Sequence, residues 1–383
     1  MNVPNSVMDN QLKDFEDRGY SDEAIKECGL FSWLNEAVCS HASDLFLSEG
    51  EQPTLKIYGI FRRLVDSVVT TEKLNKILLA ILSPQKLEQY QNGQEVDMGL
   101  DCPGCSRFRL NIFRHLTGMT IAVRPIPYEI PVMRELGLPP VFENLARLKQ
   151  GLILITGPAG SGKSTTLASF INRINQQDER HIITIEDPVE YFIPPQRSII
   201  HQREVGRHTT SFSDGLKNAL RENPDVIVVG ELRDLESIGL AVRAAETGHL
   251  VVGTLHSGTA VQAITRLLDV FDSGRQALLR VQLAQSLQAV CAQRLYKKAD
   301  GSGMVVATEV LIATFAIRNI IRAQRNQEIR GYMATGMREQ MHTFKQSIQV
   351  LIDENLVDAS CLLESGEENP VPELAAANMF RTR

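Results

Sequence analysis

The residues best suited to chemistry in this sequence form the glycine-rich run Gly157-Pro-Ala-Gly-Ser-Gly-Lys-Ser-Thr165. Its spacing matches G-x-x-x-x-G-K-[ST], in which the backbone N–H groups of a loop cradle phosphate oxygens. An apolar segment (152–155) precedes the run and a helix-compatible segment (166–174) follows it, which is the context that such a loop requires. The alternative is a glycine-rich turn without a ligand. We predict an ATP site made by Gly157, Gly160, Ser161, Gly162, Lys163, Ser164 and Thr165, with Lys163 on the β- and γ-phosphates.

A second candidate, Glu231, follows the apolar run Val226–Val229 after one glycine. An apolar strand that ends in a carboxylate is the Walker B arrangement, in which the acid holds Mg²⁺ directly or through water. The alternative is an acid that begins a helix after a buried strand. Because the same sequence carries the phosphate-binding run, we predict that Glu231 and the hydroxyl of Ser164 hold Mg²⁺.

Three carboxylates, Glu186, Asp187 and Glu190, lie within five residues after the apolar segment 181–185. Negative charges this close are costly together unless a cation or a proton is shared. One of them, placed beside a nucleotide, would orient or deprotonate the attacking water, which is typically worth about 10²–10⁴ in rate. The alternative is a solvated acidic turn.

Two histidines, His249 and His256, frame the apolar segment 250–255. Either one alone is more often structural than functional. At the two ends of a core strand beside a nucleotide site, both become candidate phosphate sensors. The pair Cys102 and Cys105 lacks the four ligands of a structural zinc site, and we predict a tight turn between two strands there.

The elements that position these residues alternate along residues 139–365. Apolar strands are expected at 152–155, 181–185, 226–229 and 250–253, and helices at 165–175, 213–222, 234–246 and 259–270. This alternation predicts a largely parallel sheet with helices on both faces, and ligands bind at the carboxyl ends of such strands. Further helices are expected at 316–322, 326–335 and 340–353.

A smaller α+β domain is expected at residues 31–126. Its pattern predicts helices at 31–38, 72–82 and 84–90, and strands at 43–48, 54–58, 61–65, 97–101, 107–113 and 119–125. Two prolines within 126–131 indicate an extended linker, which we place at 127–138. Residues 1–30 are expected to be an extension and residues 366–383 a flexible tail.

The composition excludes some classes of protein. The 383 residues carry 40 basic and 46 acidic side chains and a net charge of −6, which argues against a dedicated nucleic-acid binder. The first ten residues lack the pattern of a signal peptide, and no apolar run approaches the roughly 20 residues of a membrane helix. We expect a cytoplasmic protein, peripheral at the inner face of the membrane.

Several blocks together resemble the secretion-ATPase superfamily, and most closely the PilT-like retraction ATPases of type IV pili. Ser43-Asp-Leu opens the similarity, which extends to about Val357. The glycine-rich run is the Walker A motif. The other blocks are an Asp box (Ile183–Tyr191), an atypical Walker B motif (Asn223–Asp234) and a His box (Thr247–His256).

The resemblance implies a role for each matching residue. Glu190 matches the catalytic glutamate of the family, Glu231 the Walker B glutamate, and His249 and His256 the His-box pair. Arg109 and Arg124 match paired arginines that reach the nucleotide phosphates when the domains close. In other phosphoryl-transfer systems such an arginine is worth about 10³–10⁵ in rate.

The resemblance also implies the fold and the function. The fold would be α/β, a RecA-like P-loop ATPase domain with a smaller N-terminal α+β (PAS-like) domain. The protein would be a hexameric ATP-hydrolysing motor that acts on an inner-membrane platform protein, beside a paralogous pilus ATPase, to power pilus retraction and twitching motility. The motif Ala-Ile-Arg-Asn-Leu-Ile-Arg-Glu of retraction ATPases is here Ala316–Ala323, where alanine replaces the acid. The alternatives are an ATPase of a type II/IV secretion or DNA-uptake system and an accessory subunit with weak turnover.

Overall fold

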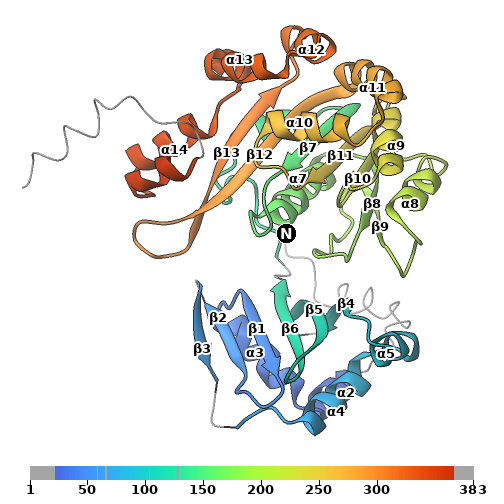
Figure 1. Cartoon of the computed structure of the whole chain (residues 1–383), viewed down its shortest axis with the longest axis vertical. Coiled ribbons are helices and arrows are strands. Elements are labelled where there is room, and N and C mark those ends of the chain that lie inside the picture. The colour runs from blue at the N-terminus through green and yellow to red at the C-terminus, as the bar shows by residue number, and fades with distance from the viewer. Residues whose placement is uncertain (1–21, 58, 65–66, 103, 127–128, 366–383) are drawn as a thin grey trace, which may run out of the picture. The chain divides into compact units, whose positions relative to one another are not determined.

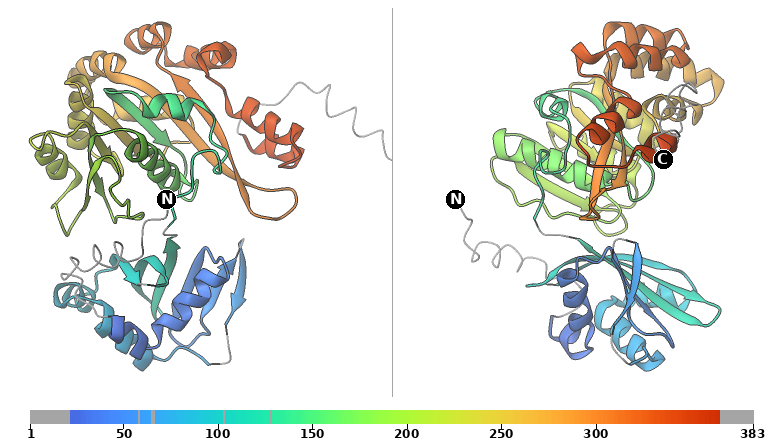
Figure 2. Two further views of the ribbon diagram at one scale, coloured as in Figure 1. Left: turned by 180° about the vertical axis from the view of Figure 1, so that it is seen from behind. Right: turned by 90° about the vertical axis from the view of Figure 1, so that its left-hand side faces the viewer.

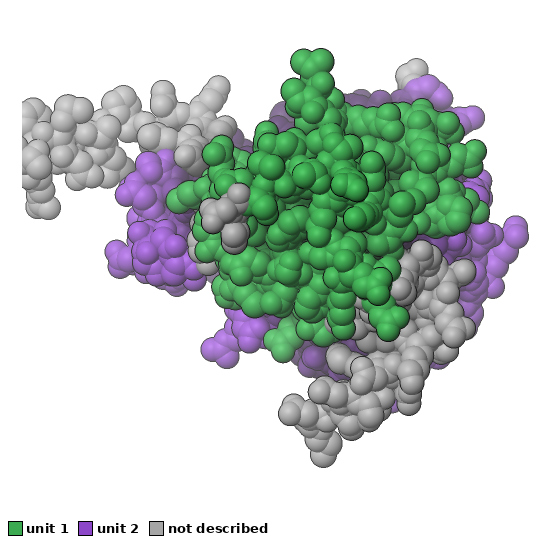
Figure 3. Space-filling view, turned by 90° about the horizontal axis from the view of Figure 1, so that it is seen from below, with its two compact units in different colours: residues 1–129, 188–192 green, residues 130–187, 193–383 purple. Residues whose placement is uncertain are grey.

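The computed structural model describes residues 22–57, 59–64, 67–102, 104–126 and 129–365. The chain divides into two compact units (Figure 3). The first comprises residues 1–129 and 188–192, and the second comprises residues 130–187 and 193–383.

The first unit contains an antiparallel sheet whose six described strands run in the order β3-β2-β1-β6-β5-β4 (Figure 1). In β1, β4 and much of β5, alternate residues are buried against the helices, which is the pattern of a sheet with one face in the core. The strands are β1 (Asp44–Ser48), β2 (Thr54–Ile57), β3 (Ile60–Arg63), β4 (Val96–Cys102), β5 (Ser106–His115) and β6 (Gly118–Ile126). The turn predicted at Cys102 and Cys105 is confirmed, since β4 pairs with β5 across it.

Four described helices pack on this sheet: α2 (Asp22–Glu27), α3 (Leu30–Cys39), α4 (Thr71–Ile81) and α5 (Pro84–Gln91). The side chains of Thr70 and Ser83 cap α4 and α5. Residues 22–30 belong to this core rather than to an extension, because Ile25 and Leu30 are fully buried in it. Residues 1–21 and the tail 366–383 lie outside the described residues.

The second unit is an α/β domain, as predicted. Its seven described strands run in the order β13-β12-β7-β11-β10-β8-β9, and all of them except β13 are parallel. The four predicted strands are confirmed as β7 (Gly151–Thr156), β8 (His181–Glu186), β10 (Val226–Val229) and β11 (Leu250–Leu255). The strands that the sequence analysis missed are β9 (Ile199–Glu204), β12 (Leu287–Lys297) and β13 (Met304–Ile312).

Helices cover both faces of this sheet (Figures 1 and 2). Leu152 and Leu154 of β7 face one apolar cluster, whereas Ile153 and Ile155 face the other. The helices on the first face include α9 (Leu235–Glu246), α10 (Ala260–Asp269), α11 (Ser273–Ser286) and α12 (Phe315–Arg322). Those on the second face are α6 (Val141–Ala146) and α7 (Lys163–Gln177).

The remaining helices are α8 (Phe212–Ala219), α13 (Ile329–Thr335) and α14 (Phe344–Asp353), with 3₁₀ turns at Asn326–Glu328, Met337–Glu339 and Ala359–Ser365. The helix predicted at 340–353 begins later because Thr343 forms a capping box with Gln346. Of the predicted linker, residues 127 and 128 lie outside the described part, and Met133 and Leu138 pack in the core of the second unit. In the described residues, no helix has the length and apolarity needed to span a bilayer.

Candidate functional site

The predicted phosphate-binding loop connects the end of β7 to the start of α7. Gly160 and Gly162 have φ angles of 75° and 85°, a backbone conformation that glycine adopts without steric cost. Gly162 is the residue before α7, so the loop leads directly into the N-terminal turn of that helix. The positive end of the helix and the curled loop together suit an anion such as a nucleotide phosphate.

The loop is held against β12, a strand that the sequence analysis missed. The Nε2 of Gln293 donates a 2.6 Å hydrogen bond to the carbonyl oxygen of Ser161. A Cβ atom at Gly157 would lie 2.4 Å from the carbonyl oxygen of Gln293. The glycine is therefore needed for the close approach of the loop to β12.

We expect Gly157→Ala to displace the loop and to weaken nucleotide binding strongly, because a backbone atom of β12 cannot move aside cheaply. Gly301→Ala is the control, since no atom lies within 4 Å of a Cβ atom there and its φ of 72° strains an alanine outside the loop, between β12 and β13. Equilibrium binding of a fluorescent ATP analogue measures the effect. Equal affinity in Gly157→Ala and the unchanged protein would contradict the argument.

Lys163 lies in the first turn of α7 with its ammonium group turned back into the loop. Its Nζ donates hydrogen bonds of 2.8 Å to the carbonyl of Gly157 and 2.9 Å to that of Pro158. The residue is only 9% exposed. The same Nζ is 3.5 Å from the Nδ1 of His256. The loop thus holds a positive charge where the motif requires one.

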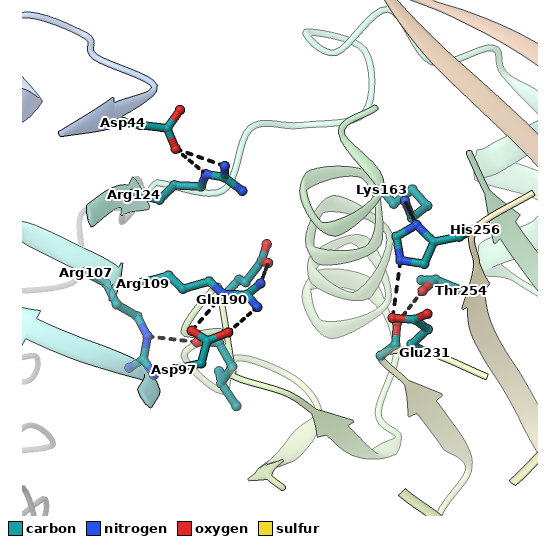
Figure 4. Close-up of polar contacts among 12 residues, drawn as sticks. Asp44, Asp97, Arg107, Arg109, Arg124, Lys163, Glu190, Glu231, Thr254 and His256 are labelled. Atoms are coloured by element: carbon teal, nitrogen blue, oxygen red, sulfur yellow. Dashed lines mark hydrogen bonds and ion pairs between the residues drawn. The ribbon is translucent and has the colours of Figure 1, made fainter. Parts of the chain in front are cut away.

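Glu231 and His256 complete this cluster (Figure 4). Because β10 and β11 are parallel, the residues that follow them meet at the carboxyl edge of the sheet. The Oε2 of Glu231 lies 3.3 Å from the Nε2 of His256 and 2.5 Å from the Nη2 of Arg233. His256 therefore bridges Glu231 and Lys163, and Arg233 is a contact that the sequence analysis missed.

The electrostatics of Glu231 suit a metal ligand. Burial raises the pKa of its carboxyl, but the hydrogen bond from Arg233 and the nearby His256 outweigh burial and lower the pKa below its ordinary value. The carboxylate is thus charged at neutral pH. Mg²⁺ prefers oxygen ligands, so this carboxylate and the hydroxyl of Ser164, next to Lys163 in α7, fit that ion chemically. When bound, Mg²⁺ would neutralise charge on the phosphates.

His249 lies elsewhere. It precedes β11, whereas the loop follows β7, and the two strands pair in parallel from Leu250 opposite Gly151 to Leu255 opposite Thr156. His249 is consequently at the amino edge of the sheet, where its Nδ1 is 3.0 Å from the carbonyl oxygen of Ala244. The two histidines thus lie at the two ends of β11, as predicted, and His256 is the one that contacts Lys163 of the loop.

The predicted arginine pair lies in the first unit. Arg109 of β5 and Arg124 of β6 are direct cross-strand partners. The Nη2 of Arg109 is 2.6 Å from Asp97 Oδ2, and the Nη2 of Arg124 is 2.9 Å from Asp44 Oδ1. The hydrogen bonds that Arg109 donates to the carboxylate of Asp97 raise the pKa of its guanidinium. Each arginine is therefore held by an aspartate on the neighbouring strand.

Glu190 also belongs to the first unit, which differs from its expected place in the nucleotide-binding domain. Its Oε1 is 3.2 Å from the Nη1 of Arg109, so the predicted catalytic acid and one of the predicted arginines form an ion pair (Figure 4). Sequence reasoning assigned no role to Asp44 or Asp97. The alternation of β1 and β4 could have indicated them, because it points both side chains to the same face as the arginines.

Comparison with known proteins gives this site its context. The model of the type II/IV secretion system protein family matches residues 20–363. A twitching motility protein of Neisseria gonorrhoeae is 42% identical, over 80% of this chain and 82% of that protein. The type IV pilus retraction ATPase PilT of Pseudomonas aeruginosa is 40% identical, over 87% of this chain and 95% of that protein.

Among solved structures, that of the pilus retraction motor PilT with bound ADP superposes with a TM-score of 0.79. It is 42% identical, and the match covers 88% of this chain and 96% of that one. The family match over residues 20–363 includes the phosphate loop and the arginine pair. The chain belongs to the type II/IV secretion system protein family.

Proposed function

We propose that this protein is an ATPase motor that hydrolyses ATP to power the retraction of type IV pili, and hence twitching motility. The observation that carries the proposal is the cluster of Lys163, His256 and Glu231 at the carboxyl edge of a parallel sheet, next to a glycine-rich loop. Its chemistry is that of nucleotide phosphates. The similarity to a twitching motility protein and to a pilus retraction ATPase, over 80% and 87% of this chain, supports the cellular role.

The roles of the individual residues follow from their chemistry. Lys163 would bind the β- and γ-phosphates, and Ser164 and Glu231 would hold Mg²⁺. Glu190 would activate the attacking water as a general base. Arg109 and Arg124 would stabilise the charge that develops on the phosphates. To contact the phosphates, the guanidinium of Arg109 must leave its ion pair with Glu190.

We further propose that the motor is a homo-hexamer at the inner face of the cytoplasmic membrane, where it acts on a platform protein of the pilus, beside a paralogous ATPase. A ring would convert hydrolysis in each subunit into movement of the platform. No direct nucleic-acid partner is proposed, given the net charge of −6.

The second candidate is an ATPase of a secretion or DNA-uptake system. It is favoured by the motif at Ala316–Ala323, which lacks the final acid of retraction ATPases. In this chain much of the motif serves packing, since Ile317, Ile320 and Ile321 lie in the core of the second unit. Arg318 bonds to the carbonyl groups of Ala313, Ala284 and Gln285. A third candidate is an accessory subunit with weak turnover.

The test compares surface pili and motility in cells that lack the gene and in cells that carry Lys163→Ala. We expect excess pili and lost twitching in both strains, because pilus assembly would continue without retraction. Bald cells would indicate an assembly motor, and normal pili a secretion ATPase; either result would refute retraction. Purified protein with ordinary fold but negligible ATP turnover would favour the accessory subunit.

A further inference from the structure

Arg107 is a buried charge that no role described above uses. It lies on β5 two residues before Arg109 and is only 8% exposed. Its Nη1 is 2.9 Å from both carboxylate oxygens of Asp101, its cross-strand partner on β4. Its Nε donates a 3.0 Å hydrogen bond to the carbonyl oxygen of Val189. Arg107 therefore joins β4 to the residue next to Glu190.

The segment that Arg107 holds, residues 188–192, is short, and the residues on both sides of it in the chain belong to the second unit. Residues 188–192 pack with the first unit, while Asp187 and Ile193 belong to the second. Ile193 is 2% exposed in the core of the second unit. The polypeptide around Glu190 is therefore covalently continuous with the phosphate-binding unit and bonded to the sheet of the first.

Arg107 and Arg109 bind this segment differently. Arg109 bonds to the side chain of Glu190, a contact that ends when either group turns to another partner. Arg107 bonds to the backbone of Val189, a contact that does not depend on the side chain of Glu190. The backbone can consequently stay fixed while the carboxylate of Glu190 leaves Arg109.

The strand beside Arg107 leaves room for its guanidinium. A Cβ atom at Gly99 would lie 2.8 Å from the Nη2 of Arg107. Gly99 has no positive φ that would itself call for glycine. Its missing side chain therefore fits the space that Arg107 occupies, an observation independent of the hydrogen bonds.

We infer that Arg107 is a positioning residue that fixes residues 188–192, which include Glu190, to the sheet of the first unit. Asp101 holds its guanidinium, and the missing side chain of Gly99 leaves space for it. Arg107 touches neither the nucleotide nor the reacting atoms in this scheme. The inference rests on the proposed function, because Glu190 matters only if the protein hydrolyses ATP. A misplacement of a catalytic group by about 1 Å can cost about 10²-fold in rate.

The test uses the full-length protein with Arg107→Gln, Gly99→Ala and the control Arg62→Gln. Arg62 forms an ion pair with Glu36 on the surface of the same unit. Gly99→Ala keeps every charge and displaces only the guanidinium.

Hydrogen exchange over residues 188–192 and steady-state ATP hydrolysis are measured for each variant. We expect faster exchange of that segment and a kcat lower by about 10- to 100-fold in both variants, with KM for ATP within twofold. Arg62→Gln should change neither.

Three results would overturn the inference. Unchanged exchange in Arg107→Gln would show that the segment is held by other contacts. Faster exchange of residues 188–192 with an unchanged kcat would show that Arg107 has a structural role only. The same conclusion would follow if Arg107→Gln lowered the stability of the protein and Gly99→Ala did not. If the unchanged protein itself hydrolyses no ATP, the proposed function fails, and the exchange data still decide whether Arg107 holds the segment.

Discussion

Lys163→Ala is expected to remove ATP turnover almost completely, by about 10³-fold or more in kcat/KM. The ammonium group is the positive charge that the glycine-rich loop holds inward, bonded to the carbonyls of Gly157 and Pro158. A positioned donor that meets developing charge is typically worth about 10²–10³ in kcat, and loss of ground-state binding adds to this. Phosphate release from purified protein measures the effect.

The control for this prediction is Lys149→Ala. Lys149 is exposed just before β7, whereas the loop follows that strand, so its loss removes the same charge from the same unit at the other end of β7. We expect turnover close to that of the unchanged protein. Thermal unfolding of Lys163→Ala should confirm that the domain is still folded. A folded Lys163→Ala protein with ordinary turnover would refute the assignment of the site.

Glu190→Gln is expected to retain ATP binding and to lower kcat by about 10² or more, because glutamine cannot accept the proton of the attacking water. The substitution is mild for the fold, since the amide oxygen can still accept the hydrogen bond from Arg109. Binding of a fluorescent ATP analogue and single-turnover hydrolysis separate the two effects. Glu179→Gln, which alters an exposed ion pair with Arg197, is the matched control.

Glu186 is the rival for the same role and gives the sharpest contrast. Its Oε1 accepts hydrogen bonds from the Thr184 hydroxyl at 2.6 Å and from Gln202 at 3.2 Å, within the second unit. We expect Glu186→Gln to reduce turnover less than Glu190→Gln. If Glu186→Gln abolishes turnover and Glu190→Gln does not, the general base is Glu186, and the role of Arg107 in positioning Glu190 loses its basis.

The sequence predicted well those parts whose signal is local. The run from Gly157 to Thr165 specifies its own loop because glycines, lysine and hydroxyl must follow one another at fixed spacing. The continuous apolar strands β7, β8, β10 and β11 were predictable because both faces of each are buried. Strand β12 was not, since Leu287–Lys297 contains one β-branched residue, Val290, and two alanines, which are depleted in strands.

The chemistry of the phosphate loop, and the presence of Glu231, His256 and the arginines, can be predicted from the order of residues alone. Which of these side chains contact one another depends on the folded structure. His256 reaches Lys163 and His249 does not, because parallel pairing separates the two ends of β11. Glu190 pairs with Arg109, more than eighty residues earlier, because β5 contributes a row of arginines to one face of its sheet. Such contacts join residues far apart in the chain, and their partners depend on strand order and register, which no local pattern contains.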